Sequence, residues 1–212
     1  MEILATKLGM IQTNCYLVGT EQKNAVIIDP GDNAQKILSL LEEKGWTLQK
    51  ILLTHGHFDH AMAVNDLVDA TGAQVYIHKE DQELITDPTK FYVFHQPFGE
   101  FRPISAISLE DGDDVTQDEL TFHCIHTPGH TKGSCVYLCG NTMFSGDTLF
   151  AGSCGRTDFY GGSHAQIVQS LHKLADLEGN YRVLPGHEEE TTLDYERKTN
   201  PYLGRISYDD FF

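Results

Sequence analysis

The sequence predicts a mixed α/β domain, and three observations indicate it. Through the first half of the 212-residue chain, short β-branched runs alternate with stretches of helical spacing. In the second half, residues 134–145 have the pattern of two strands joined at Gly140 and Asn141, as in a tight hairpin. The length suits a single domain over residues 1–212, because a chain of this size buries about 70% of its unfolded surface.

Eight short runs are predicted to be strands. Most of them are rich in β-branched or aromatic residues and are bounded by Gly, Asp or Asn, which favour turns. They are residues 14–19, 25–29, 50–54, 74–78, 120–126, 134–139, 142–145 and 181–184.

Four stretches have the spacing of amphipathic helices. Asp32 or Asn33 can cap the first, and Pro201 stops the last. The four cover residues 32–45, about 60–72, 163–174 and about 192–200. The segment 88–108 has no such period and carries several aromatic side chains with three prolines, so it is expected to be a long loop. Covering a substrate and packing against the core are equally open roles for this loop.

Charge and cysteine content narrow the possible functions. The 15 Lys and Arg residues against 31 Asp and Glu give a net charge of −16, which argues against a nucleic-acid partner because phosphate binding needs a basic face. The chain has neither a basic, apolar leader nor eighteen consecutive apolar residues, so we expect a cytoplasmic protein without a membrane partner. The five cysteines are odd in number and lack CxxC spacing, which indicates reduced thiols. The oligomeric state stays open.

Residues 54–60, THGHFDH, are rich in metal-ligating side chains. They follow a predicted buried strand and precede a predicted helix. Alternate side chains of an extended segment share a face, so His55, His57 and Asp59 can point together, with His60 at the turn into the helix. A plain helix-capping role would account for Asp59 alone. The pattern therefore indicates a metal site.

Local residues cannot complete such a site, because a metal ion needs three or more protein ligands. Three further candidates lie far along the chain, each at a strand end or beside a turn. They are His130 in TPGHTKGS, Asp147 in FSGDTLF and His187 in VLPGHEEET. Together with the first motif they provide five imidazoles and two carboxylates.

Four motifs carry a family resemblance. THGHFDH, TPGHTKGS, SGDTLF and LPGHEEET, in this order, resemble the metal motifs of the metallo-β-lactamase superfamily, and IIDPG resembles its early strand motif. Within that superfamily, DTLFAGSCGRTDF resembles the glyoxalase II-like thioesterases, and TTLDYERKTNPYL resembles their short bacterial branch. The resemblance implies a four-layer αββα sandwich with metals along one edge.

The resemblance also implies how the ligands divide between two divalent ions. His55, His57 and His130 would hold the first ion, Asp59, His60 and His187 the second, and Asp147 would bridge them. Nitrogen-rich sets suit zinc, while added carboxylates make iron or manganese tolerable, especially at the second site. Two ions, zinc first among the candidates, are the expected cofactors.

The expected reaction is hydrolysis of a small thioester. Two ions about 3.5 Å apart can lower the pKa of a shared water toward 7, so that hydroxide attacks the thioester carbonyl. Asp59 can also accept a proton from that water, and the chain has no GxSxG serine elbow. The chain lacks the C-terminal basic region of long glyoxalase II enzymes, and its end, ISYDDFF, is acidic and aromatic. We therefore expect D-lactoylglutathione or another low-molecular-weight thioester.

Two residues near the expected site have open roles. Asp29 either orients a ligand histidine or is a turn residue at a strand end, and the resemblance favours the first. Arg156 either holds a substrate carboxylate with two hydrogen bonds or pairs with Asp158. The two roles of Arg156 are equally open.

Rival functions come from the same superfamily. The GRTDF stretch also resembles persulfide dioxygenases, which use one iron, but those enzymes carry PAH where this chain has PGH at residues 185–187. Hydrolysis of another ester or a lactam is a second rival. A purely structural zinc site is closed and four-coordinate, whereas seven ligands for two ions leave positions open.

Overall fold

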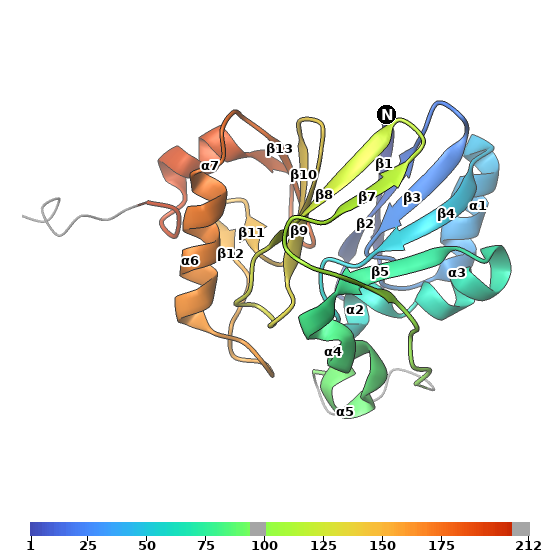
Figure 1. The fold of residues 1–212 in the computed structure, drawn as a ribbon, viewed down its shortest axis with the longest axis horizontal. Helices are drawn as coiled ribbons and strands as arrows, with labels where there is room; N and C mark the ends of the chain where they lie inside the picture. The colour runs from blue at the N-terminus through green and yellow to red at the C-terminus, as the bar shows by residue number, and fades with distance from the viewer. Residues whose placement is uncertain (94–100, 205–212) are drawn as a thin grey trace, which may run out of the picture.

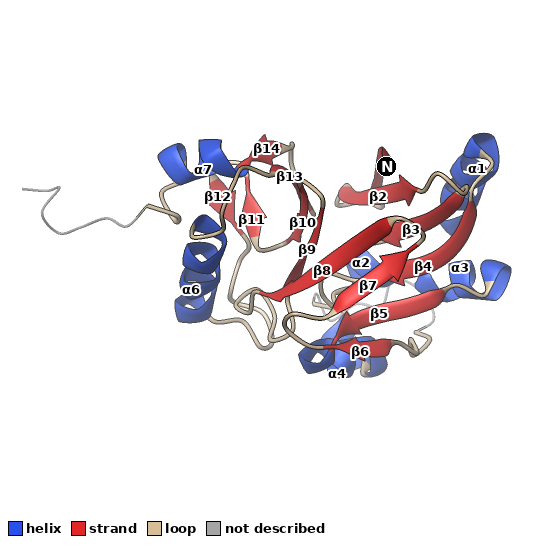
Figure 2. Ribbon diagram, turned by 45° about the horizontal axis from the view of Figure 1, so that its top comes forward, coloured by secondary structure: helices blue, strands red, loops and turns tan. Residues whose placement is uncertain are grey.

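The computed structural model describes residues 1–93 and 101–204. Two six-stranded sheets lie face to face, and helices cover their outer faces (Figures 1 and 2). The predicted α/β class and the αββα order of layers are therefore confirmed. In these residues no helix is both long and apolar enough to cross a membrane.

The first sheet is formed by the first 109 residues. Its strands β1 to β3 pair antiparallel, and β3 to β6 pair parallel. In spatial order they are β1 (Glu2–Leu8), β2 (Thr13–Gly19), β3 (Asn24–Ile28), β4 (Thr47–Leu52), β5 (Gln74–His78) and β6 (Ile107–Leu109). The helices on its outer face are α1 (Ala34–Lys44), α2 (Phe58–Ala61) and α3 (Val64–Thr71). The short helices η1 (Lys79–Asp81), α4 (Gln82–Thr86) and α5 (Pro88–Phe91) follow β5.

The second sheet is formed by the rest of the chain. Its neighbours pair antiparallel, except that β10 and β13 are parallel. In spatial order they are β14 (Thr191–Thr192), β13 (Arg182–Pro185), β10 (Thr142–Gly146), β9 (Cys135–Cys139), β8 (Leu120–His126) and β7 (Asp114–Gln117). A ribbon of β11 (Leu149–Phe150) and β12 (Ser153–Cys154) and the helices α6 (His164–Ala175) and α7 (Leu193–Thr199) lie beside this sheet.

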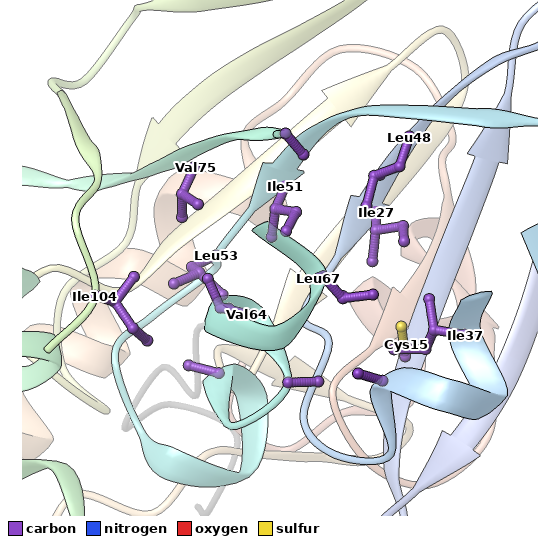
Figure 3. Close-up of a cluster of buried hydrophobic side chains, with 14 of the residues drawn as sticks. Cys15, Ile27, Ile37, Leu48, Ile51, Leu53, Val64, Leu67, Val75 and Ile104 are labelled. Atoms are coloured by element: carbon purple, nitrogen blue, oxygen red, sulfur yellow. The ribbon is translucent and has the colours of Figure 1, made fainter. Parts of the chain in front are cut away.

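Three apolar cores join the four layers, because successive side chains of a strand point to opposite faces. In β3, Ile27 packs toward the outer helices, while its neighbour Ile28 packs between the sheets. Figure 3 shows Ile27 and Ile51 of the first sheet facing Leu67 of α3. A third cluster packs α6 against the second sheet. Each sheet is thus buried on both faces, which makes its strand ends rigid supports.

The predicted elements agree with this fold in most places. All eight predicted strands are present with bounds shifted by at most three residues, and the hairpin turns at Gly140 and Asn141. Asn33 caps α1 by accepting a hydrogen bond from the backbone N–H of Lys36 at 3.1 Å. The expectation of one helix over 60–72 is wrong.

That helix divides into α2 and α3 because the backbone N–H of Ala63 donates to the carbonyl oxygen of Pro30 at 3.1 Å. The strands β1, β6 and β7, which lie at sheet edges, were not predicted. The segment 88–108 is not a plain loop, since it contains α5 and the first part of β6. Its Phe91 and Tyr92 are buried in the core, whereas Phe94, His95 and Phe98 lie outside the described residues.

Phe144 tests the packing between the sheets. It is fully buried, with its ring centroid 5.6 Å from that of Tyr16 and 6.2 Å from that of Phe122. Phe144→Ala should lower the free energy of unfolding by about 3–5 kcal/mol, because a large cavity would remain between two rigid sheets. Chemical denaturation measures this change. Tyr195→Ala, at a side chain 59% exposed, is the control and should change stability by less than about 0.5 kcal/mol. A loss below 1 kcal/mol for Phe144→Ala would contradict close packing here.

Candidate metal centre

The predicted ligands converge at one edge of the sandwich because several strands end there. In the first sheet β3 and β4 run parallel, and in the second sheet β8, β10 and β13 share one direction. Four of the seven side chains follow β4, and one follows each of β8, β10 and β13. They are His55, His57, Asp59 and His60, then His130, Asp147 and His187.

The donor atoms of these residues form three overlapping groups, each with all its atoms within 4.8 Å of one another. The groups are His55, His57 and His130; His55, His60 and Asp147; and Asp59, His60 and His187. The Asp147 carboxylate lies between the others, since its Oδ1 is 3.4 Å from His60 Nε2 and its Oδ2 is 3.5 Å from His130 Nε2. Asp147 Oδ2 is also 3.7 Å from His187 Nε2. All seven predicted residues are therefore brought together.

Three of the imidazoles are oriented through their second ring nitrogen. His60 Nδ1 lies 2.9 Å from Asp29 Oδ2, His55 Nδ1 lies 3.2 Å from Thr54 Oγ1, and His130 Nδ1 lies 2.7 Å from the carbonyl oxygen of Arg156. A proton on each Nδ1 leaves Nε2 as a lone-pair donor toward the shared space. Asp29 also accepts hydrogen bonds from the backbone N–H and hydroxyl of Thr54, at 2.8 and 2.6 Å.

The chemistry of this cluster fits divalent metal ions. His55 Nε2, His57 Nε2, His60 Nε2 and Asp147 Oδ1 are buried and have no hydrogen-bond partner in the described chain. Each unsatisfied buried polar atom costs about 1–3 kcal/mol, which a bound cation between such donors would offset. Imidazole nitrogens with a few carboxylate oxygens are donors that zinc, iron and manganese accept.

Electrostatics divide the cluster into a neutral and a charged part. Burial lowers the pKa of His55 well below its usual range and the pKa of His57 to about 3, so both rings are neutral and able to bind metal. For His60, burial again lowers the pKa, but the nearby carboxylates, Asp59 first, raise it well above its usual range. Burial raises the pKa of Asp147, yet His60 and other histidines hold it at about 2. A cation binding near His60 therefore displaces a proton.

A cavity of about 330 Å³ opens onto the cluster. Its apolar wall residues are Ile11, Phe58, Val93, Phe150 and Phe159, and the proposed ligands and other polar residues line the rest. His187 and Asp59 are the cluster members nearest to solvent, with side chains 23% and 11% exposed. Because His57, His130 and Asp147 line the cavity as well, it gives a small molecule access to both ends of the cluster.

Arg156 lines this cavity and makes the internal ion pair that was one of its two open roles. Its Nε and Nη2 donate to the two carboxylate oxygens of Asp158, both at 2.7 Å, and its guanidinium lies 4.0 Å from the centre of the Phe159 ring. Its backbone carbonyl orients His130. The pairing with Asp158 is therefore present in the structure.

Two residues at the start of β2, which carries no recognisable motif, support the cluster. Thr13 Oγ1 donates to Asp59 Oδ2 at 3.0 Å. Asn14 Nδ2 donates to the carbonyl oxygens of Pro185 and Glu188, both at 3.0 Å, and so fixes the loop that carries His187. The only sequence signal for these two supporting residues was that they form a polar pair at the start of a buried strand.

Comparison with known proteins agrees with this geometry. Residues 8–187 match the family model described as the metallo-beta-lactamase superfamily. An uncharacterized protein of Mycobacterium leprae is 39% identical over 96% of this chain and 99% of its own length. The hydroxyacylglutathione hydrolase GloC of Haemophilus influenzae is 33% identical over 98% of this chain and all of its own length.

Solved structures of similar fold include the B3 metallo-beta-lactamase BLEG-1, with a TM-score of 0.85 and 36% identity over 95% of this chain and 99% of that one. A di-iron-bound form of TTHA1623 has a TM-score of 0.83 and 37% identity over 94% of this chain and all of that one. ETHE1 from Myxococcus xanthus has a TM-score of 0.83 and 29% identity over all of this chain and 88% of that one. With its motifs, its sandwich fold and these matches, the chain belongs to the metallo-β-lactamase superfamily.

Proposed function

We propose that the chain is a cytoplasmic, binuclear metal-dependent hydrolase of small thioesters, similar to hydroxyacylglutathione hydrolase. The observation that carries this proposal is the position of Asp147, whose two carboxylate oxygens face different histidines of the cluster. The similarity to GloC over the whole chain supports a thioester substrate. The five free cysteines are in keeping with a reducing compartment.

The seven donors would divide as their groups do. One ion would be held by the first group, which is His55, His57 and His130. The other would be held by the second group, which is Asp59, His60 and His187, and Asp147 would serve both. Such ions, when bound, activate a water molecule as nucleophile and polarise a carbonyl group. We propose zinc, with iron as the alternative that the similar di-iron structure supports.

The chain's own groups would support hydrolysis in three ways. Asp59 Oδ2, which accepts a hydrogen bond from Thr13 and lines the cavity, can accept the proton of the attacking water. The apolar cavity walls would hold the acyl group and exclude bulk water. Burial raises the pKa of Cys154, the cysteine that lines the cavity, so its thiol stays protonated and is a poor nucleophile.

We propose D-lactoylglutathione, or another low-molecular-weight thioester, as the substrate. A thiol leaving group with a pKa of about 8.5 departs as thiolate without a strong general acid. Arg156 would contact an anionic part of the substrate, although its ion pair with Asp158 already offsets much of its charge.

Persulfide dioxygenase is the main alternative function, and the similarity to the ETHE1 structure is the observation that supports it. Gly186 supports the binuclear hydrolase instead. A Cβ atom at this position would lie 2.3 Å from Asp147 Oδ1 and 2.6 Å from His60 Cε1. The alanine of the dioxygenase motif PAH would thus displace two proposed ligands, whereas glycine leaves room for both.

The decisive experiment is metal analysis of the purified protein with a panel of substrates. Thioesters, β-lactams and glutathione persulfide would be assayed with zinc and with iron. Thioester hydrolysis with about two ions per chain is the expected result. One iron per chain with oxygen uptake on persulfide would overturn the proposal, and dominant β-lactam hydrolysis would favour the activity named for BLEG-1.

Gly186→Ala should reduce the bound metal from about two ions per chain toward one, because the added methyl group displaces His60 and Asp147. Elemental analysis measures this change. Gly204→Ala is the matched control, since the nearest atom to a Cβ there is 3.9 Å away. About two ions per chain in Gly186→Ala would contradict the steric role proposed for this glycine.

Asp147→Ala should reduce the bound metal from about two ions to one or none, because a bridging ligand serves both sites. Equilibrium dialysis followed by elemental analysis gives the stoichiometry. Asp114→Ala removes a carboxylate that is 54% exposed, pairs with His123 and belongs to none of the donor groups, so it should bind metal like the wild type. Full metal content and activity in Asp147→Ala would remove this residue from the site.

His55→Ala and Asp59→Ala should differ in their effects. His55→Ala should lower kcat by about a hundredfold or more, because it impairs the ion that would stabilise the developing oxyanion. Asp59→Ala should keep some metal in the first group, and its rate should depend more strongly on added metal and on higher pH. Steady-state kinetics at several metal concentrations and pH values measures both. Identical behaviour of the two variants would argue against two separate sites.

A further inference from the structure

Asp81 is a fully buried carboxylate that contacts two of the loops carrying proposed ligands. Its Oδ2 accepts hydrogen bonds from the backbone N–H of Gly56 at 3.0 Å and from Thr131 Oγ1 at 2.7 Å. Its Oδ1 accepts one from the backbone N–H of Gly133 at 2.7 Å. Gly56 lies between His55 and His57 in the sequence.

The second loop of this contact carries another proposed ligand, since Thr131 directly follows His130. One side chain therefore joins the loops that supply all three histidines of the first group. Asp81 lies at the end of η1, outside every motif in which we expected a ligand.

The backbone of the two loops lies so close to the segment that carries Asp81 that only glycine fits at positions 56 and 133. A Cβ atom at position 133 would lie 2.6 Å from the backbone nitrogen of Asp81 and 2.7 Å from its Cγ, and one at position 56 would lie 2.6 Å from Leu84 Cβ. Both glycines allow the backbone to approach the segment that carries Asp81. The structure thus fits this segment tightly against the two loops.

The state of the Asp81 side chain supports an organising role. A buried carboxylate is costly unless it is hydrogen-bonded, and this one receives three hydrogen bonds. Burial raises its pKa to about 6, with the three donors acting in the opposite direction, so the group is an anion at neutral pH. The loops are therefore held by charge-assisted hydrogen bonds.

We propose that Asp81 is a positioning residue that fixes the distance between the His55–His57 loop and the His130 loop, and thereby sets the zinc affinity of the first group. This inference rests on the proposed metal-dependent function, but it concerns metal affinity and not the identity of the substrate. Residues that orient metal ligands from outside typically change affinity by about 10–100-fold when replaced.

Asp81→Asn tests the proposal, because it keeps the size of the side chain but turns one acceptor oxygen into an NH₂ group facing N–H or O–H donors. We expect zinc affinity to fall at least about tenfold, measured on the full chain by competition with a chromophoric chelator. For thioester hydrolysis at fixed free zinc, kcat should fall with little change in KM, since Asp81 does not line the cavity. Thr131→Val removes one of the three donors and should give a smaller loss.

Glu196→Gln is the matched control. Glu196 is also fully buried and accepts hydrogen bonds from the backbone N–H of Gly152 at 2.8 Å, Thr191 Oγ1 at 2.7 Å and Asn200 Nδ2 at 2.9 Å. Its replacement should lower Tm without changing zinc affinity, because none of these partners is next to a proposed ligand in the sequence, whereas Gly56 and Thr131 are.

Two outcomes would overturn the inference: zinc affinity in Asp81→Asn within twofold of the wild type, or an equal loss in Glu196→Gln at the same drop in Tm. If Asp81→Asn does not fold, Thr131→Val decides by the same comparison, and wild-type zinc affinity in that variant would overturn the inference. A wild-type protein that binds zinc but hydrolyses no thioester would refute the proposed function alone. The affinity comparison would still decide the role of Asp81.

Discussion

The burial of five imidazoles and two carboxylates at one edge of the sandwich is the constraint on which the rest of the site depends. Polar groups removed from water are costly unless each finds a partner. The chain meets this cost with supporting groups, which hold ring nitrogens, carboxylates and loop backbones in place. They are Asp29, Thr54, Thr13, Asp81 and the carbonyl of Arg156. Among the atoms that these supports leave unsatisfied, His60 Nε2 and Asp147 Oδ1 lie only 3.4 Å apart, which is the kind of arrangement a cation requires.

The two parts of the centre differ in charge and in access to solvent. His55, His57 and His130 are almost fully buried, and burial lowers the pKa of each. Asp59 and His187 border the cavity, where burial acts against charge on His187 but the hydrogen bond that its Nε2 donates to Asp59 raises its pKa. The first group is therefore a neutral nitrogen set, and the second combines charge with more exposed side chains.

The rigidity of this edge comes from packing far from it. The inter-sheet core aligns the strand ends, and two tyrosine hydroxyls cross between the sheets near the site. Tyr16 donates to the carbonyl oxygen of Pro185 at 2.6 Å, and Tyr137 donates to that of Leu53 at 2.9 Å. Because Leu53 precedes the first motif and Pro185 precedes His187, these bonds fix two ligand-bearing segments from opposite sheets. These two hydrogen bonds thus link the inter-sheet core to the segments that carry the proposed ligands.

The sequence by itself predicted eight of the strands, the helices α1, α6 and α7 and the seven clustered residues, because hydrophobic periodicity and dense His and Asp motifs are local patterns. It did not reveal Asp81 or Thr13, whose partners lie 50 and 46 residues away along the chain. It also left the choice open for Arg156, which pairs with Asp158 in the structure. Only the tertiary structure decided these contacts, since a hydrogen bond between distant segments depends on how two sheets pack and leaves no periodic signal in either segment.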